Sequence, residues 1–231
     1  MSQKPVIQHF SDVLCVWAYV AHIRFERLVE KFSDQVDFET HYCPVFPDAR
    51  GKISRNWEGR GGFHGYAAHV DTVACKFDHV KLNPDAWSKV QPASSTPVHL
   101  LLKAAELVEL ENGTAPDACL LDRPSYHLSW QLRRAFFEEA SDIASWEVQR
   151  ECVETVGLDY GAVQGSFMDG SAFAALDRDV LAAQKASVTG SPTFVMNNGR
   201  QVMYGNVGFH LLEANVLELL RSPGPEEASW C

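Results

Sequence analysis

The sequence predicts an α/β fold that carries a long helical insert. Two observations lead to this prediction. Residues 6–43 have the pattern of a strand, a helix and a second strand, and residues 171–220 have the pattern of a helix, a hairpin and a closing helix. Between these two parts, apolar residues recur at helical spacing in several segments. A chain of 231 residues is long enough to build one or two domains of ordinary size.

The N-terminal elements form one strand-helix-strand unit. Residues Val6–Phe10 have the character of a short buried strand, and the next apolar positions predict a helix from about Cys15 to Phe32. A second strand is expected over Val36–Cys43. A right-handed crossover should place the two strands parallel in one sheet.

The middle of the chain is rich in glycine over residues 51–65 and then helical. Four helices are predicted from apolar spacing: Ala67–Phe77, Pro97–Leu110, Ser125–Glu139 and Ser145–Val156. The chain then returns through a helix (Ser171–Ala186), a hairpin (193–204) turning at Asn198-Gly199, and a closing helix (Gly208–Leu220). The Pro- and Glu-containing tail from Ser222 to Cys231 is expected to be mobile.

The charge balance argues against a nucleic-acid or membrane module. The chain has 20 basic and 30 acidic residues and a formal charge of −10, with no dense basic cluster to bind a phosphate backbone. No apolar stretch approaches the roughly 20 residues needed to span a bilayer. The N-terminus Met1-Ser2-Gln3-Lys4-Pro5 lacks an apolar signal core. A cytoplasmic protein is therefore expected.

Cys15 lies where the first strand turns into the first helix. Unpaired backbone N–H groups and the helix dipole favour an anion there, so the pKa of its thiol is expected to fall below that of a free cysteine. The alternative is a small buried hydrophobic residue, because free cysteine is among the most buried residue types. The other cysteines show no close pairing or zinc-like spacing and are interpreted as structural or incidental: Cys43, Cys75, Cys119, Cys152 and Cys231.

Pro192 opens the predicted hairpin. Proline lacks the N–H that a strand ladder uses, and an X-Pro bond adopts the cis form at low cost. A cis Ser191-Pro192 bond would leave the backbone groups of Ser191 free to pair with an extended peptide or thiol substrate. An ordinary trans proline at the start of a strand is the alternative.

Taken together, these segments resemble the DsbA-like branch of thioredoxin-fold proteins, which includes FrnE-type oxidoreductases and 2-hydroxychromene-2-carboxylate isomerases. The resemblance rests on residues 10–19, 43–48, 136–143, 156–159 and 188–195. It implies an α/β thioredoxin fold with an inserted all-helical domain: a thioredoxin-like domain of residues 1–60 and 160–222, a helical insertion domain of residues 61–159, and a flexible tail, 223–231. It also implies that Cys15 is the nucleophile, with Ser191 and Pro192 at the cis-proline position.

The motif Cys15-Val16-Trp17-Ala18 departs from the dithiol pattern, because Ala18 stands where dithiol members carry the resolving cysteine. A lone thiolate depends on glutathione or another external thiol to clear its mixed disulfide. The favoured interpretation is a monothiol thiol-disulfide oxidoreductase that uses glutathione as cosubstrate. The first alternative is a glutathione-dependent isomerase or transferase of the hydroxychromene-carboxylate isomerase or kappa-class type, acting on a small aromatic molecule. The second is a non-catalytic binding protein, and a homodimer is left open.

Five further residues near Cys15 are candidates for the site. Trp17 and Ala18 are expected to line the substrate groove. Ser11 and Asp12 are candidate caps of the helix, and His9 is a candidate proton relay. No metal is expected, because one segment rich in metal-binding side chains lacks closely paired ligands; it contains His64, His69, Asp71, Cys75, Asp78 and His79.

Overall fold

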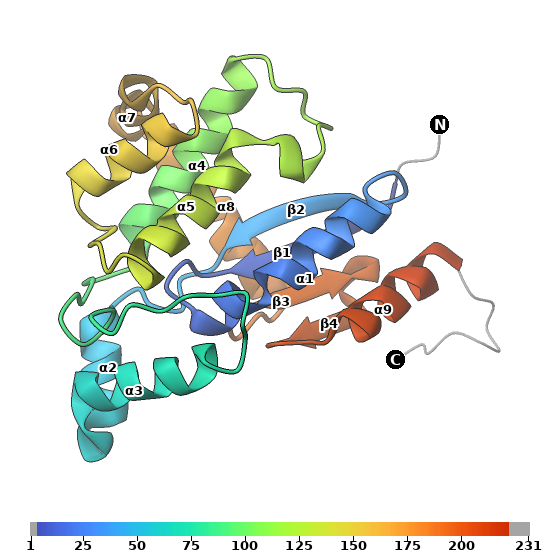
Figure 1. Ribbon diagram of the computed structural model, residues 1–231. Coiled ribbons are helices and arrows are strands. Elements are labelled where there is room, and N and C mark those ends of the chain that lie inside the picture. The colour runs from blue at the N-terminus through green and yellow to red at the C-terminus, as the bar shows by residue number, and fades with distance from the viewer. Residues whose placement is uncertain (1–3, 222–231) are drawn as a thin grey trace.

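A computed structural model describes residues 4–221 and places a mixed four-stranded sheet at the centre of the molecule (Figure 1). The strands are β1 (Val6–Ser11), β2 (Asp37–Tyr42), β3 (Thr193–Met196) and β4 (Gln201–Tyr204), in the order β2-β1-β3-β4. β1 pairs in parallel with β2 and antiparallel with β3, and β3 pairs antiparallel with β4. The strand-helix-strand unit at the N-terminus is therefore parallel, as the sequence predicts.

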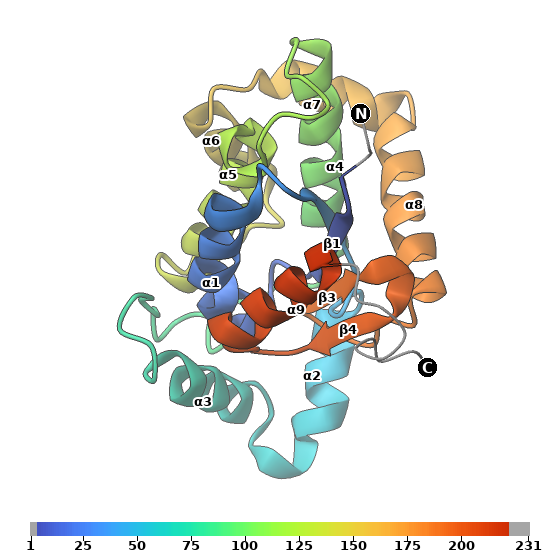
Figure 2. The ribbon, with the colours of Figure 1, turned by 90° about the vertical axis from the view of Figure 1, so that its right-hand side faces the viewer.

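Helices cover both faces of the sheet (Figure 2). Helices α1 (Val16–Phe32) and α9 (Phe209–Arg221) lie on one face, where their apolar residues pack with Ile7 and Phe194. Helix α8 (Ser171–Lys185) lies on the other face, where Ala183 packs with Phe10 and Val195. The alternation of side chains along β1 and β3 supplies an apolar set to each face.

The remaining helices lie outside this layered unit. They are α2 (Ala49–Trp57), α3 (Gly62–Ala74), α4 (Thr96–Glu111), α5 (Pro124–Phe137), α6 (Trp146–Thr155) and α7 (Tyr160–Met168). Three short 3-10 turns span Glu58–Arg60, Leu120–Asp122 and Asn197–Gly199. In Figure 1, α4 to α7 gather above the sheet, whereas α2 and α3 form a separate pair below it.

The structure differs from the sequence-based expectation in three segments. α2 and α7 are helices that the apolar pattern does not predict, because each buries few residues: Ala49 and Ile53 in α2, and Tyr160, Val163 and Ser166 in α7. The hairpin turns through four residues, 197–200, rather than through Asn198-Gly199 alone. The mobile tail expected over 222–231 lies outside the described residues.

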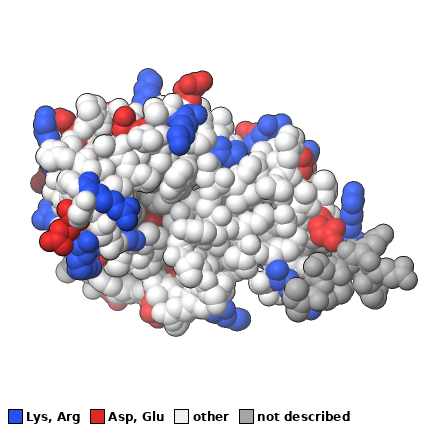
Figure 3. Space-filling model, turned by 90° about the horizontal axis from the view of Figure 1, so that it is seen from below, with Lys and Arg blue, Asp and Glu red and all other residues white. Residues whose placement is uncertain are grey.

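Charged side chains are interspersed over the lower surface of the molecule. Figure 3 shows this face, where lysine and arginine side chains lie near acidic ones around the margin and uncharged residues fill the centre. None of the helices within residues 4–221 is long and apolar enough to cross a membrane.

A chain of charged side chains connects the edge strand β2 to helices α8 and α4. His41 Nδ1 lies 2.8 Å from Asp179, and Lys103 contacts both Asp179, at 3.2 Å, and Glu106. Asp179 also accepts the Tyr42 N–H at 2.9 Å. Burial lowers the pKa of His41, but Asp179 and Glu39 more than compensate and raise it to about 9.

The first prediction concerns pH and stability. Because the pKa of His41 in the folded chain lies above its ordinary value of 6.5, the stabilisation it supplies is complete below about pH 6.5 and is lost as the pH rises through about 9. The free energy of unfolding should therefore fall by about 2–3 kcal/mol across this window, and His41→Gln should flatten the fall. Urea titrations at several pH values would measure this free energy. If it fell with pH as steeply in His41→Gln as in the parent protein, the raised pKa of His41 would be contradicted.

Candidate functional site

Cys15 lies between the end of β1 and the start of α1. Its backbone is extended (φ −82°, ψ 114°) and it is the N-cap residue of α1, so the helix begins one residue later than predicted. The Cys15 Sγ–H donates a hydrogen bond to the backbone oxygen of Ser191 at 3.1 Å. The Ser191-Pro192 peptide bond is cis. The structure thus brings Cys15, Ser191 and Pro192 together, although they lie far apart in the sequence.

The loop that contains Ser191 is held in place from two sides. The Ser191 hydroxyl accepts the Asp12 N–H at 2.9 Å, which ties the loop to the end of β1. On the other side, the ring of Tyr204 packs so closely that a Cβ at Gly190 would come within 2.5 Å of it. A larger residue at position 190 would force the exposed Tyr204 ring to move.

The carboxylate of Asp12 collects the hydrogen bonds that shape this site. Oδ1 accepts the Leu14 N–H at 2.8 Å, and Oδ2 accepts the N–H groups of Val45, at 2.8 Å, and Phe46, at 3.0 Å, and the Ser95 hydroxyl at 2.8 Å. Burial raises the pKa of Asp12, but nearby His99 and the donors from Leu14 and Ser95 outweigh burial and leave it below its ordinary value. A buried carboxylate with this many donors stays ionised.

Neither Asp12 nor Ser11 caps α1. Asp12 bonds to Leu14, which precedes the helix, and the N-cap residue Cys15 makes no side-chain cap bond. The Ser11 hydroxyl instead accepts a hydrogen bond of 2.7 Å from Nη2 of Arg133. The two residues predicted as caps therefore connect β1 to other parts of the chain.

Arg133 is a buried cation next to the end of β1. Its side chain is 3% exposed; Nη1 donates to the Ser129 carbonyl, and Nε has no partner among the described residues. Burial lowers the pKa of Arg133, whereas the negative forms of Tyr42 and Tyr126, and after them those of Asp12 and Cys15, raise it. Arg133 is thus a buried cation at the end of β1 that the sequence-based account of this site lacks.

The pKa of Cys15 is shifted opposite to the sequence-based expectation. Burial is the main cause and raises the pKa of this thiol, which is 7% exposed, and the Asp12 carboxylate raises it further. The nearby backbone N–H groups of Ala18 and Trp17 and the side chain of Ser191 lower it by less. The helix N-terminus is present, but loss of hydration dominates. The resting group is a neutral thiol that donates a hydrogen bond to the Ser191 backbone oxygen.

The other predicted site residues divide into near and distant ones. Ala18 is buried in the first turn of α1, and Trp17, partly buried, packs against the large core cluster that contains Cys15. His9 lies elsewhere: its ring contacts Phe25 and Phe194, with ring centroids 4.1 and 4.8 Å away. Burial holds the pKa of His9 well below its ordinary value. The structure therefore does not bring His9 to the sulfur.

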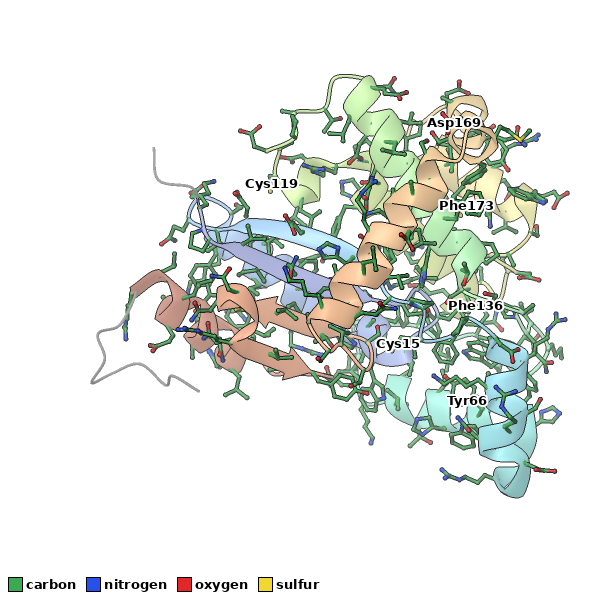
Figure 4. All side chains as sticks on the ribbon, turned by 180° about the vertical axis from the view of Figure 1, so that it is seen from behind. Cys15, Tyr66, Cys119, Phe136, Asp169 and Phe173 are labelled. Carbon is green, nitrogen blue, oxygen red and sulfur yellow. The ribbon has the colours of Figure 1, made fainter. Side chains whose placement is uncertain are left out.

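Several residues of the site come from segments that gave no local signal. Ser95 and His99 approach Asp12 from the start of α4, with His99 Nε2 at 3.6 Å from the carboxylate. Tyr66 of α3 lies on the same side of the molecule as Cys15 (Figure 4), and burial followed by the charge of Cys15 raises its pKa. Serine, histidine and tyrosine are common in helices, so only the fold identifies these three.

The remaining described cysteines are unpaired thiols. Burial, with the charges of Asp12 and Cys15, raises the pKa of Cys43 to about 12. Cys75 is exposed, Cys119 half-buried and Cys152 buried. Within residues 4–221, no three His, Cys, Asp or Glu side chains gather closely enough to hold a metal ion.

The second prediction follows from the buried thiol. The alkylation rate of Cys15 should rise with a midpoint above the roughly 8.5 of a free thiol, because ionisation must occur in a poorly hydrated site. Peptide mass mapping of iodoacetamide-treated protein at a series of pH values would follow each thiol. Exposed Cys75 is the internal control, and Cys15→Ser identifies the peptide. A midpoint for Cys15 at or below that of Cys75 would contradict the raised pKa of the Cys15 thiol.

Comparison with known proteins identifies the fold. Residues 121–216 match the family model of the DSBA-like thioredoxin domain. Among solved structures, the chain is similar to a protein from Streptomyces coelicolor described as a probable DsbA oxidoreductase, with a TM-score of 0.70, 18% identity, and coverage of 97% of this chain and 94% of the other.

Two further structures are similar over nearly their whole length. The cytosolic disulfide reductase DsbM from Pseudomonas aeruginosa has a TM-score of 0.64 and 19% identity, over 92% of this chain and 98% of that one. A 2-hydroxychromene-2-carboxylate isomerase has a TM-score of 0.61 and 15% identity, over 94% and 97%. No curated protein matches the chain. The fold is therefore the DsbA-like thioredoxin fold, which confirms the resemblance drawn from the sequence.

Proposed function

We propose that this protein is a monothiol thiol-disulfide oxidoreductase that works with glutathione and uses Cys15 as its nucleophile. One observation carries the proposal: the Cys15 sulfur lies at the N-terminus of α1 and contacts the Ser191 carbonyl beside the Ser191-Pro192 bond. An extended peptide or glutathione that pairs with the backbone of Ser191 would bring its own sulfur to Cys15. A structure of the DsbM reductase with glutathione shows that a neighbour of this fold binds this cosubstrate.

The proposed reaction has two thiol-disulfide exchanges. Cys15 loses its proton, and its thiolate attacks one sulfur of a substrate disulfide, so that a mixed disulfide forms and the other sulfur takes up a proton and leaves as a thiol. A glutathione thiolate then attacks the substrate sulfur of this mixed disulfide, forms a new disulfide with it and releases Cys15 in reduced form. Ala18 offers no thiol for an internal second step. Arg133 supplies the buried positive charge that favours the thiolate when a substrate replaces the Ser191 contact.

A second candidate is a glutathione-dependent isomerase. The neutral, buried Cys15 thiol favours it, because such a group is a hydrogen-bond donor in the resting site and a poor nucleophile. In that function Cys15 would hold and polarise the cosubstrate's sulfur without forming a disulfide.

The third prediction tests the covalent step. Oxidised glutathione should transfer one glutathionyl group to Cys15 and release one reduced glutathione, and the adduct should persist because position 18 carries no resolving thiol. Mass spectrometry of the intact protein and of its peptides would measure this, with Cys15→Ser as the control. An unmodified Cys15 together with reversible binding of reduced glutathione would favour the isomerase. Neither modification nor binding would favour a non-catalytic binding protein.

The fourth prediction restores the missing thiol. Ala18→Cys should shorten the lifetime of the Cys15-glutathione adduct at least tenfold, because the introduced thiol attacks Cys15 from within the same helical turn. Ala18→Ser is the matched control, with similar size and a weak nucleophile. Time-resolved quenching in acid followed by mass spectrometry gives the lifetimes. Equal lifetimes in the two variants would show that position 18 does not reach the sulfur.

A further inference from the structure

A cleft of about 650 Å³ runs along the free edge of β2, away from Cys15. Its floor is the strand from Val36 to His41, its walls come from α4 and α8, and the segment 116–120 closes one end. Figure 4 shows this arrangement: α8 crosses one end of β2, and Cys119 marks the loop beyond the other. The volume lies in the range of about 300–1,000 Å³ typical of ligand pockets.

Every second residue of β2 points its backbone N–H and C=O groups into this cleft. Asp37 N–H donates to Pro5 and Cys43 N–H donates to Ser11, so the odd-numbered residues of β2 face β1. The even-numbered residues Phe38, Thr40 and Tyr42 therefore point their N–H and C=O groups outward. β2 is at the edge of the sheet, and no further strand lies beyond it in the described chain.

Among residues 4–221, only one of these three residues has a hydrogen-bond partner for its outward N–H group. The Tyr42 N–H donates to the Asp179 carboxylate, which occupies the place that a neighbouring strand's carbonyl would take. Phe38 and Thr40, both lining the cleft, have no such partner for their backbone groups among residues 4–221. The Thr40 hydroxyl is also buried without a hydrogen-bond partner. An edge of this kind is a template for another strand.

The charge of the cleft indicates which occupant would fit. His41, Asp179, Lys103 and Glu106 pair with one another, and Glu39 pairs with His41. Over the whole lining, five acidic side chains (Asp37, Glu39, Glu106, Asp117 and Asp179) face four basic ones (His41, Lys103, Arg123 and Arg178), so the cleft has no strong field to attract a phosphate or a polybasic segment. Apolar side chains of α4 and the 116–120 segment line the other wall, among them Leu107, Leu110 and Leu120. An uncharged backbone with apolar side chains at alternate positions matches this surface.

We propose that the β2 cleft binds an extended, uncharged stretch of another polypeptide, which adds to the sheet as a fifth strand hydrogen-bonded to Phe38 and Thr40. This docking site goes beyond the proposed function and does not depend on the chemistry of Cys15. A strand placed about 4.8 Å from β2 would direct every second side chain toward α4.

The fifth prediction uses a cysteine-free probe, acetyl-Ser-Val-Thr-Val-Ser-amide, with the Cys15→Ser protein. Titration should shift the Phe38 and Thr40 amide resonances in NMR spectra and give a dissociation constant. Thr40→Pro removes the outward N–H but keeps the bonds to β1, because proline is tolerated at such edge positions. It should weaken binding at least tenfold. Thr40→Val, which keeps this N–H and loses only the hydroxyl, should stay within about threefold of the parent.

Two N-methylated peptides make the test independent of the variants' folding. One carries methyl groups on the valine nitrogens, and the other carries them on the serine and threonine nitrogens. Because only one edge of an added strand faces β2, one pattern should abolish binding and the other should retain it. Absence of binding by the parent peptide, equal binding of the two methylated peptides, or equal binding to Thr40→Pro and Thr40→Val would overturn the proposal.

Discussion

The site depends on the hydrogen bonds that the Asp12 carboxylate accepts. Its oxygens accept hydrogen bonds from Leu14 in the β1-α1 turn, from Val45 and Phe46 after β2, and from Ser95 at the start of α4. Three chain segments therefore meet at one buried negative charge. Removing such an acceptor would leave several buried donors unsatisfied, at a cost of about 1–3 kcal/mol for each donor. The Asp12 N–H also donates to the Ser191 hydroxyl, which ties the Ser191 loop to the same turn.

This arrangement has an electrostatic consequence for Cys15. The carboxylate that orders the turn also opposes ionisation of the thiol, in addition to the larger effect of burial. The buried guanidinium of Arg133, which bonds to Ser11, acts weakly in the opposite direction. The protonation of Cys15 therefore reflects mainly the loss of hydration, opposed by the hydrogen bonds of Ala18 and Ser191, and a bound substrate that changes local hydration would shift this balance.

The sequence was sufficient to predict the elements with strong apolar periodicity and the proximity of Cys15 to the Ser191-Pro192 bond. It was insufficient where few residues are buried: α2 is anchored by Ala49 and Ile53, and α7 contains two glycines. The sign of the Cys15 pKa shift was also wrong, because position at a helix N-terminus can be inferred from the chain, whereas burial depends on α3 and the Ser191 loop. Arg133 could not be paired with Ser11, since 122 positions separate them.

Helix α4 links the two candidate sites of the molecule. Ser95 and His99 contact Asp12 and its turn, and Lys103 and Glu106 line the cleft beside β2. These four residues follow one another at intervals of four, four and three, which places them along one face of the helix. One face of α4 therefore supplies polar side chains to both places, Ser95 and His99 to the Cys15 turn and Lys103 and Glu106 to the β2 cleft.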